Sequence, residues 1–220
     1  MTYFTKDFIA FFEELSENNH KAWFDDNRKR YQESVKKPFE SFVNEMILRL
    51  QENESDLQLT AKEAVFRINR DIRFSKDKTP YKTHAGAGIS KGGRKSPHPG
   101  YYLELGPKRI MVGGGIYFLD KEGLQKIRSE IAHATDEFAG LVENKDFKKR
   151  FGEVKGERNK VLPAKYKEVA QKQPLIANKH YYYMTTLEPR HITNTGLPDL
   201  LMEYYRIGYP LNSFFKKAIV

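Results

Sequence analysis

The spacing of hydrophobic residues changes twice along the chain, and these changes limit the folds that it can adopt. Near the start, hydrophobic residues recur at helical intervals behind a possible cap at Thr5: Phe8, Phe11, Phe12 and Leu15. Residues 66–74 alternate between hydrophobic and polar, which is typical of a strand. Helical spacing returns after residue 124. This order predicts an α+β fold with a mostly antiparallel sheet flanked by N-terminal and C-terminal helices.

The same patterns predict the remaining elements. A second helical stretch covers residues 20–51, in which Pro38 either bends the helix or begins a new one, and residues 51–56 form a loop. Further strands are expected at residues 84–90, 101–105, 110–118 and 180–187, with a hairpin turn at 106–109. Helices are expected at residues 124–141 and 197–219, the second interrupted near Gly208 and Pro210. We find no internal repeat and no linker, and we expect residues 1–220 to form one domain.

The composition excludes several classes of protein. The chain has no cysteine, so disulfides, thiolate metal sites and cysteine nucleophiles are absent. Its hydrophobic runs are short, and its first residues lack the pattern of a signal peptide. We therefore expect a cytoplasmic protein with no membrane partner. No motif specifies a reaction, so enzymatic activity and oligomeric state stay open.

Positive charge is concentrated in one part of the chain. The net charge is +9, and residues 67–94 hold eight basic and two acidic residues, or +6. The other 192 residues therefore carry only +3. A concentrated patch raises the local potential and attracts anions, whereas solubility alone favours dispersed charge. This segment is the first candidate site.

The side chains suited to an anion lie between positions 67 and 84. Alternate residues of a strand share a face, about 7 Å apart, so Arg67, Asn69, Asp71 and Arg73 are expected to project together onto a concave surface. Arg70 breaks the alternation, which indicates a bulge or a strand end near Asn69. Guanidinium groups offer planar donor pairs to phosphate oxygens. The predicted ligand-binding residues are Arg67, Asn69, Arg70, Asp71, Arg73, Ser75, Lys76, Lys78, Lys82 and His84.

Three functions and one structural role fit these residues. The first function is binding of an anionic small molecule or another phosphate-bearing ligand. The second is an enzyme acting on a phosphate ester, with Asp71, Asp77 or His84 as acid or base. The third is binding of single-stranded nucleic acid, since several tyrosines accompany the basic residues: Tyr81, Tyr101, Tyr102 and Tyr117. In the structural role, Arg–Asp pairs tie a loop to the sheet as a clasp.

Glycines and histidines give weaker signals. Glycines flank the basic segment or lie on neighbouring strands, where bare backbone admits a ligand or a packed element: Gly86, Gly88, Gly92, Gly93, Gly113, Gly114 and Gly115. No two histidines have the fixed spacing of a helical metal motif. We therefore expect no metal site and no cofactor.

Four segments also follow a known family pattern. They are residues 8–31, with Asn18-Asn19 and Trp23-Phe24, and residues 70–84, 100–103 and 112–115. Together they resemble the family catalogued as domain of unknown function 2461, over nearly the whole chain and most sharply before residue 118. The resemblance implies a single-domain α+β protein, widespread in bacteria, from a family without an established activity, substrate or cofactor. It marks residues 70–84 as a family hallmark, which fits a binding site or a structural clasp.

Overall fold

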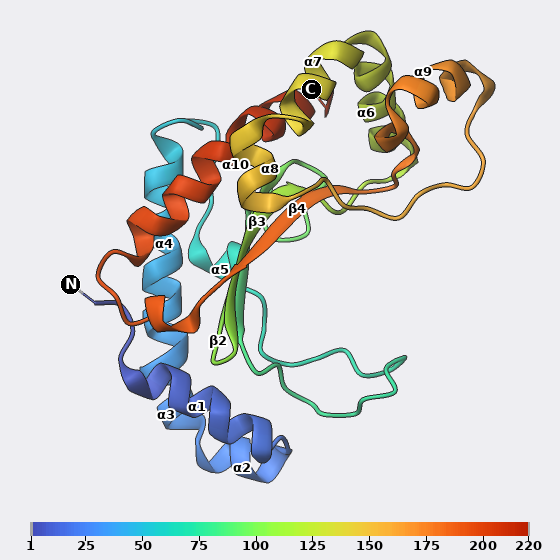
Figure 1. Cartoon of the computed structure of the whole chain (residues 1–220). Coiled ribbons are helices and arrows are strands. Elements are labelled where there is room, and N and C mark those ends of the chain that lie inside the picture. The colour runs from blue at the N-terminus through green and yellow to red at the C-terminus, as the bar shows by residue number, and fades with distance from the viewer. Residues whose placement is uncertain (1, 220) are drawn as a thin grey trace.

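The computed structural model describes residues 2–219. Its four strands form one antiparallel sheet in the order β1-β2-β3-β4: β1 (Ala85–Ser90), β2 (Gly100–Gly106), β3 (Arg109–Ile116) and β4 (Tyr181–Leu187). Helices precede and follow the sheet in the chain (Figure 1). The predicted α+β fold is therefore confirmed, together with four of the five expected strands.

The helices fall into three groups. The first contains α1 (Lys6–Glu17), α2 (Lys21–Asp26), α3 (Arg28–Arg30), a π-helical stretch (Tyr31–Lys36), α4 (Lys37–Gln51) and α5 (Ala61–Ala64). Between β3 and β4 lie α6 (Lys121–His133), α7 (Thr135–Val142), α8 (Lys145–Phe151) and α9 (Lys167–Lys172), with 3-10 turns at Ala164–Tyr166 and Pro174–Ala177. A 3-10 turn at Pro189–His191 leads to α10 (Leu197–Ile219). Pro38 stands in the first turn of α4, directly after the π-helical stretch, so it marks the change from π-helix to α-helix within one continuous helical segment.

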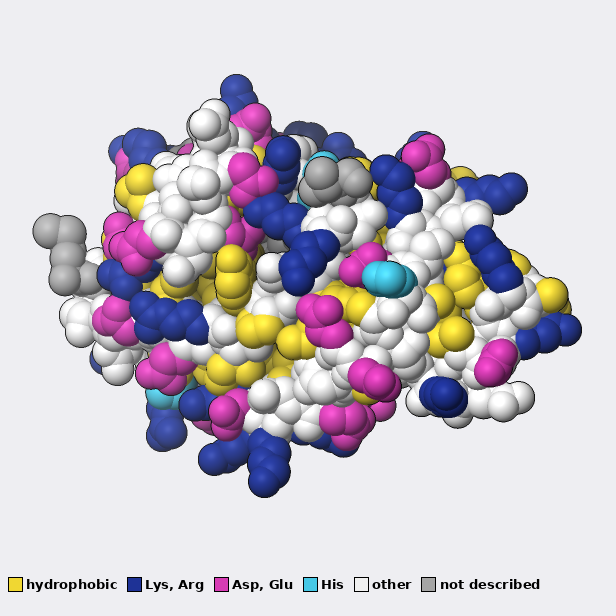
Figure 2. Space-filling model, turned by 90° about the horizontal axis from the view of Figure 1, so that it is seen from above, with side chains coloured by type: hydrophobic (Ala, Val, Ile, Leu, Met, Phe, Trp, Pro, Cys, Tyr) yellow, Lys and Arg dark blue, Asp and Glu magenta, His cyan; other side chains and the backbone are white. Residues whose placement is uncertain are grey.

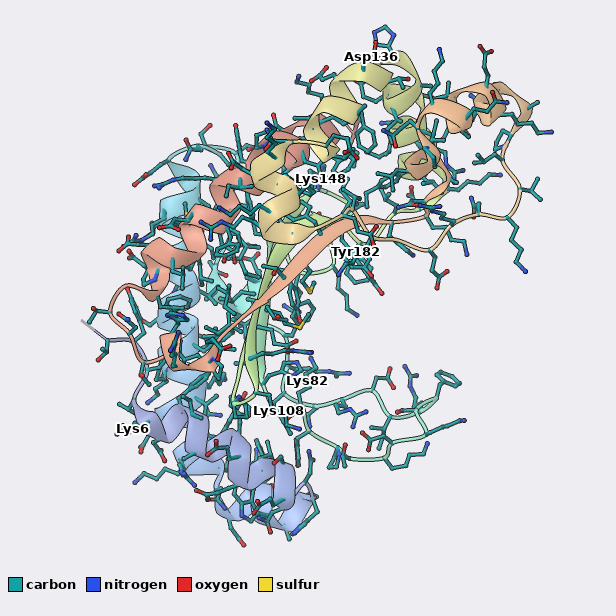
Figure 3. The ribbon with its side chains drawn as sticks, in the orientation of Figure 1. Lys6, Lys82, Lys108, Asp136, Lys148 and Tyr182 are labelled. Atoms are coloured by element: carbon teal, nitrogen blue, oxygen red, sulfur yellow. The ribbon has the colours of Figure 1, made fainter. Side chains whose placement is uncertain are left out.

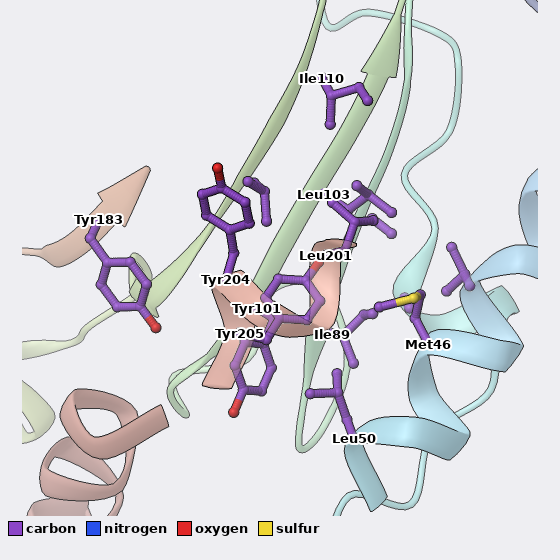
Figure 4. Packing of buried hydrophobic residues seen from close by; sticks show 14 of the residues in the cluster. Met46, Leu50, Ile89, Tyr101, Leu103, Ile110, Tyr183, Leu201, Tyr204 and Tyr205 are labelled. Carbon is purple, nitrogen blue, oxygen red and sulfur yellow. The ribbon is translucent and has the colours of Figure 1, made fainter. Parts of the chain in front are cut away.

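One face of the sheet is covered and carries the core. Helices α4 and α10 pack on this face (Figure 1), and the alternate strand residues that point to it are buried: Ala87, Ile89, Leu103, Leu105, Ile110, Val112, Tyr181 and Tyr183. Figure 4 shows Ile89, Leu103 and Tyr101 of the sheet gathered with Met46 of α4 and Tyr205 of α10. Within residues 2–219, no helix packs across the opposite face of the sheet as α4 and α10 do across this one.

Tyr183 fixes the position of α10 on the sheet. Its ring packs against two glycines, Gly114 of β3 and Gly208 of α10. A methyl group added to Gly114 would lie 2.9 Å from the Tyr183 Cζ, and one added to Gly208 would lie 2.6 Å from it. Its hydroxyl donates to Asn212 Oδ1 (3.1 Å), and Asn212 Nδ2 donates to the Gly100 carbonyl (3.0 Å). These buried polar groups satisfy one another, and they tie α10 to two strands at once.

The expected strand over residues 66–74 is wrong. Only isolated bridges occur there, at Val65–Ala87 and Asn69–Tyr81, so the backbone pairing ends close to the strand end expected near Asn69. Beyond that point the chain leaves the sheet, and no other element covers the hydrophobic residues of the alternating pattern. Phe74 is 95% exposed. The alternating pattern therefore has a buried side only at its start, where Ile68 lies in the core.

Two expectations about the helices of the C-terminal half also need correction. Helix α10 continues through Gly208 and Pro210, because residues on both sides of the proline are buried against the sheet and hold the helix together. The helix expected over residues 124–141 is divided at Ala134 between α6 and α7.

Two glycines in helices provide a test of the packing around Tyr183. Gly208→Ala forces a methyl group against the Tyr183 ring, so we expect it to lower the free energy of unfolding by about 1–3 kcal/mol. Gly140→Ala in α7 meets open space and should raise it by up to ~1 kcal/mol through helix propensity. Thermal or urea unfolding of both variants measures the difference. Equal effects would show that α10 does not rest on Tyr183 in this way.

Candidate functional site

The segment richest in predicted site residues is the basic loop, residues 67–84, which leads from α5 to β1. It projects from one end of the sheet (Figure 1). At its base, the Lys82 N–H donates to the Ile68 carbonyl and the Arg70 N–H to the Pro80 carbonyl, each over 2.8 Å. The loop thus begins as a narrow ribbon of two paired segments. The tip beyond Arg70 is mostly exposed.

Arg70 ties the two sides of the basic loop together. Its guanidinium donates to the carboxylate of Asp77 and to the hydroxyl of Thr79, and the Thr79 N–H also donates to Asp77 (2.9 Å). The bond from the Thr79 backbone, followed by that from Arg70, lowers the pKa of Asp77 to about 2. A carboxylate with so low a pKa is a weak general base near neutral pH.

Arg73 forms a second ion pair within the loop. Its Nη2 and Nε donate to Asp71 over 2.7 Å and 2.9 Å, which lowers the pKa of Asp71 to about 2. Its guanidinium also lies 5.8 Å from the ring of Phe74 at the exposed tip. The predicted convergence of Arg67, Asn69, Asp71 and Arg73 on one strand face is therefore not found, because this part of the chain forms no strand and two arginines pair locally.

The predicted residues of the basic loop do not all converge at one point. Asn69 and Lys76 are exposed, Ser75 is half-buried, and the Lys78 ammonium donates to the Ile72 carbonyl (2.9 Å). Lys82 reaches back to the Arg67 carbonyl (3.0 Å), and its ammonium lies 5.2 Å from the Phe66 ring centre.

A cationic cluster forms at the base of the loop around Phe66. Burial lowers the pKa of Lys82, and the charges of Arg67 and Arg94 lower it further. Arg94 arrives from the loop after β1 and is held by the carbonyls of Lys62 and Glu63. Two cations from opposite sides of the basic loop, Arg67 and Lys82, and one from the loop after β1, Arg94, therefore influence one another, with the Phe66 ring beneath Lys82.

Next to this cluster, the uncovered face of the sheet forms a cleft of about 960 Å³, here called the open cleft. Sheet register places Tyr102 beside Gly113, and Gly113 beside Met184, in one row across three strands. Aromatic residues occur throughout the lining: Phe66, Tyr101, Tyr102, Tyr117, Phe118, Phe151 and Tyr182. Of these, Tyr101 and Phe151 are buried and belong to the core. Tyr117 and Phe118 are 55% and 41% exposed. Glycines such as Gly88 and Gly115 leave parts of the floor as bare backbone.

The charged residues that line the open cleft are all basic. They are Arg94, Lys148, Lys149, Arg150 and Lys155, and no Asp or Glu among residues 2–219 joins them in the lining. Figure 3 shows Lys148 and Tyr182 toward one end of the sheet and Lys82 toward the other. In the view from above, by contrast, basic and acidic side chains are interspersed (Figure 2). The cleft is thus more uniformly basic than that face of the molecule.

The basic residues at the α8 end differ in how they are held. Lys148 pairs with Glu143 (2.5 Å), and Arg150 donates to the Tyr204 hydroxyl (3.1 Å). Within the described chain, Lys149 and Lys155 have no carboxylate within 4.0 Å. The backbone of Lys155 pairs with Tyr182 of β4, which fixes its position beside the sheet. Lys149 and Lys155 are therefore available to an anion.

His84 has a different setting from the rest of the loop. Its Nε2 lies 3.5 Å from Glu104 Oε2, and Glu104 is buried on β2. Burial lowers the pKa of His84, and the charge of Glu104 opposes that shift. The structure therefore places this predicted residue with a buried carboxylate, apart from the loop tip.

Several cleft residues have no counterpart among the predicted site residues. Tyr182 and Met184 share a face of β4 by alternation, and Lys148, Lys149 and Lys155 belong to the lysine-rich stretch after residue 142. The alternation and the lysine content were visible in the sequence. The sequence does not reveal the sheet register, which places β4 and this lysine-rich stretch opposite the basic loop.

The described residues offer neither a membrane-spanning helix nor a cluster of metal ligands. No helix within residues 2–219 is long and apolar enough to cross a membrane. No group of three or more His, Asp or Glu side chains in the same part of the chain could hold a metal ion.

Limited trypsin digestion can test how the loop is held. We expect Arg70→Ala to speed cleavage after Lys76 and Lys78, because the variant releases both Asp77 and Thr79. Arg73→Ala also removes one trypsin site, but the interaction that it removes is an exposed ion pair with Asp71. This variant should therefore leave both the cleavage rate and the melting temperature nearly unchanged. A large drop in melting temperature for Arg73→Ala would instead identify the loop as a structural clasp.

Comparison with known proteins gives one result. The family model described as "Conserved hypothetical protein (DUF2461)" matches residues 7–214. Neither the curated proteins nor the solved structures contain a match to the chain. The family match covers most of the chain and includes the basic loop, the sheet and nearly all of α10. The chain therefore belongs to the DUF2461 family of conserved hypothetical proteins.

Proposed function

We propose that the protein binds single-stranded nucleic acid in the open cleft, with phosphates on the basic side chains and bases on the aromatic rings. The observation that carries this proposal is the cleft lining, which combines aromatic rings and basic groups without a carboxylate. Proteins that bind single strands use this combination, because every base has a flat face and every nucleotide a phosphate.

The aromatic groups suit unpaired bases. Tyr102 and Tyr182 project from the sheet and are half-buried, so part of each side chain is accessible. Tyr117 stacks on His180 with ring centres 5.0 Å apart, which steadies an exposed ring at the cleft rim. Stacking of a base on an aromatic side chain contributes about 1–3 kcal/mol. A base inside a duplex has both faces covered, so a single strand is the better match.

The charges suit an extended polyanion. Lys149 and Lys155 lie toward the α8 end of the cleft, and Lys82 with Arg67 and Arg94 lies at the basic-loop end. A strand that crosses the sheet between these groups would place phosphates at both ends. Arg70 and Arg73 are already paired with carboxylates, so they contribute less to binding.

A small phosphate-bearing molecule is the second candidate, in line with the expectation from the sequence. The cationic cluster around Phe66 favours it, because Lys82, Arg67 and Arg94 could surround one phosphate. The two candidates differ in one measurable respect. Affinity for a strand rises with its length, whereas a small ligand uses the cluster alone.

Salt dependence tests the contribution of the phosphates. Binding of a labelled single strand should weaken with salt, with log K falling by about 0.7 per neutralised phosphate for each decade of salt. Lys155→Gln and Lys82→Gln should each lower the affinity and reduce that slope by up to ~0.7. Lys6→Gln, an exposed lysine of α1 distant from the cleft, is the matched control (Figure 3). Binding without salt dependence would reject the nucleic-acid proposal.

Substitution of one ring tests the stacking. Tyr182→Ala should weaken binding by about 1–3 kcal/mol while leaving the salt slope unchanged, because the tyrosine carries no charge. Tyr209→Ala, a partly exposed tyrosine of α10 outside the open cleft, should leave the affinity unchanged. Fluorescence anisotropy with both variants measures the effect. Equal losses for the two variants would show that the bases do not lie on the open cleft.

A further inference from the structure

Four polar side chains meet at the basic-loop end of the sheet. Glu104 Oε2 accepts a bond from the Tyr102 hydroxyl (3.1 Å) and lies 3.5 Å from His84 Nε2. Glu104 Oε1 lies 3.7 Å from Arg109 Nε. The carboxylate comes from the centre of β2, and only 10% of its side chain is exposed. A buried carboxylate, an imidazole, a phenol and a guanidinium therefore form one cluster.

The cluster faces a hollow between the sheet and α1. The hollow has a volume of about 370 Å³, and His84, Glu104, Arg109 and Lys108 line it, together with Glu13 and Ser16 of α1. Tyr102, which lines the open cleft, bonds to Glu104, which lines the hollow, so this pair of side chains connects the two. Figure 3 shows Lys82 and Lys108 toward this end of the sheet. A strand leaving the open cleft at this end would reach the hollow.

The fold alone gives no reason for these groups. Glu104 pairs through its backbone with Gly86 and Met111, and its side chain belongs to the uncovered face of the sheet. Burying a carboxylate beside an imidazole and a guanidinium costs desolvation that an apolar side chain would avoid. Residues that can move protons, gathered in a hollow beside a basic cleft, are typical of a catalytic site.

We propose that this cluster cleaves RNA, with His84 and Glu104 as the catalytic residues; the inference rests on the proposed binding of single strands in the open cleft. RNA supplies its own nucleophile, the ribose 2′-hydroxyl, so no co-reactant is needed. Lys82 and Arg109 contribute positive charge near the reacting phosphate. Tyr102 is a positioning residue, because it donates to Glu104 and holds the carboxylate in place.

The reaction balances as a transesterification. The Glu104 carboxylate takes the proton of the 2′-hydroxyl while the 2′-oxygen forms a bond to phosphorus. The bond from phosphorus to the 5′-oxygen breaks, and the His84 imidazolium gives its proton to that oxygen. The products are a 2′,3′-cyclic phosphate and a free 5′-hydroxyl. A proton then returns from Glu104 to His84 across their contact, which restores the starting state.

The groups around His84 set the expected pH dependence. Burial and the charges of Lys82 and Arg109 lower its pKa below 6.5, and Glu104 opposes them; Lys108 and Glu13 also face the hollow. Cleavage needs the protonated imidazole. The rate should therefore fall as the pH rises through the lowered pKa of His84.

The test uses a labelled DNA strand that contains one ribonucleotide, incubated with the full-length protein and a chelator. We expect a single cut after the ribonucleotide, with a cyclic phosphate end, and no cut in the all-DNA strand. Glu104→Gln and His84→Ala should each reduce the rate by ~10²-fold or more while retaining binding and the melting temperature. His133→Ala, an exposed histidine of α6, is the control and should cleave normally.

The outcomes separate the two proposals. Binding without cleavage across the pH range overturns the RNA-cleaving site and leaves the binding proposal standing. Absence of both binding and cleavage overturns both. Equal cleavage by the wild type, Glu104→Gln and His84→Ala reveals a contaminating ribonuclease and rejects the site. Tyr102→Phe gives a further readout: loss of the bond to Glu104 should lower the cleavage rate while strand binding stays unchanged, and an unchanged cleavage rate would overturn the positioning role.

Discussion

The packing of Tyr183 against two glycines is the contact on which the arrangement of the molecule depends. Because Gly114 and Gly208 lack side chains, α10 approaches the sheet closely enough for Asn212 to bond to both Tyr183 and the Gly100 carbonyl. This contact commits one face of the sheet to the core. The chain between β3 and β4 forms an arm at one end of the sheet and the basic loop forms another, and the face between them stays open (Figure 1).

The effect of the protein's charge on a ligand depends on where the charged residues lie. In the basic loop, Arg70 and Arg73 are paired with aspartates, so the part of the sequence with the highest charge density is partly neutralised at its tip. Within the described residues, Lys149 and Lys155 have no carboxylate within 4.0 Å, and they come from the stretch after residue 142, at the α8 end of the open cleft. Their effect on a ligand depends on the fold, because it brings together residues that are distant in sequence.

Much of the fold was predictable from the sequence, but the site was less so. The alternation in β2, β3 and β4 and the helical spacing of α1, α4 and α10 each matched a buried face, and these predictions are confirmed. Residues 66–74 also alternate, apart from Arg70, yet form no strand, because alternation cannot reveal whether a partner is present. Pro210 lies inside α10, since tertiary burial outweighed its local cost. The ligand-binding role of the ten residues chosen from the sequence stays a prediction. Of them, the structure brings Arg67 and Lys82 near the open cleft and places His84 beside Glu104.

The two arms are also joined to the outermost strands through their backbones. Val65, just before the basic loop, bridges to Ala87 of β1, and Lys155 exchanges two backbone bonds with Tyr182 of β4. Unpaired outer strands are templates on which other chains can add and aggregate. Here a second molecule that approached either outer strand would meet a segment already bonded to it. The arms that border the open face thus also protect the sheet from growing, and changes at their tips leave that protection intact.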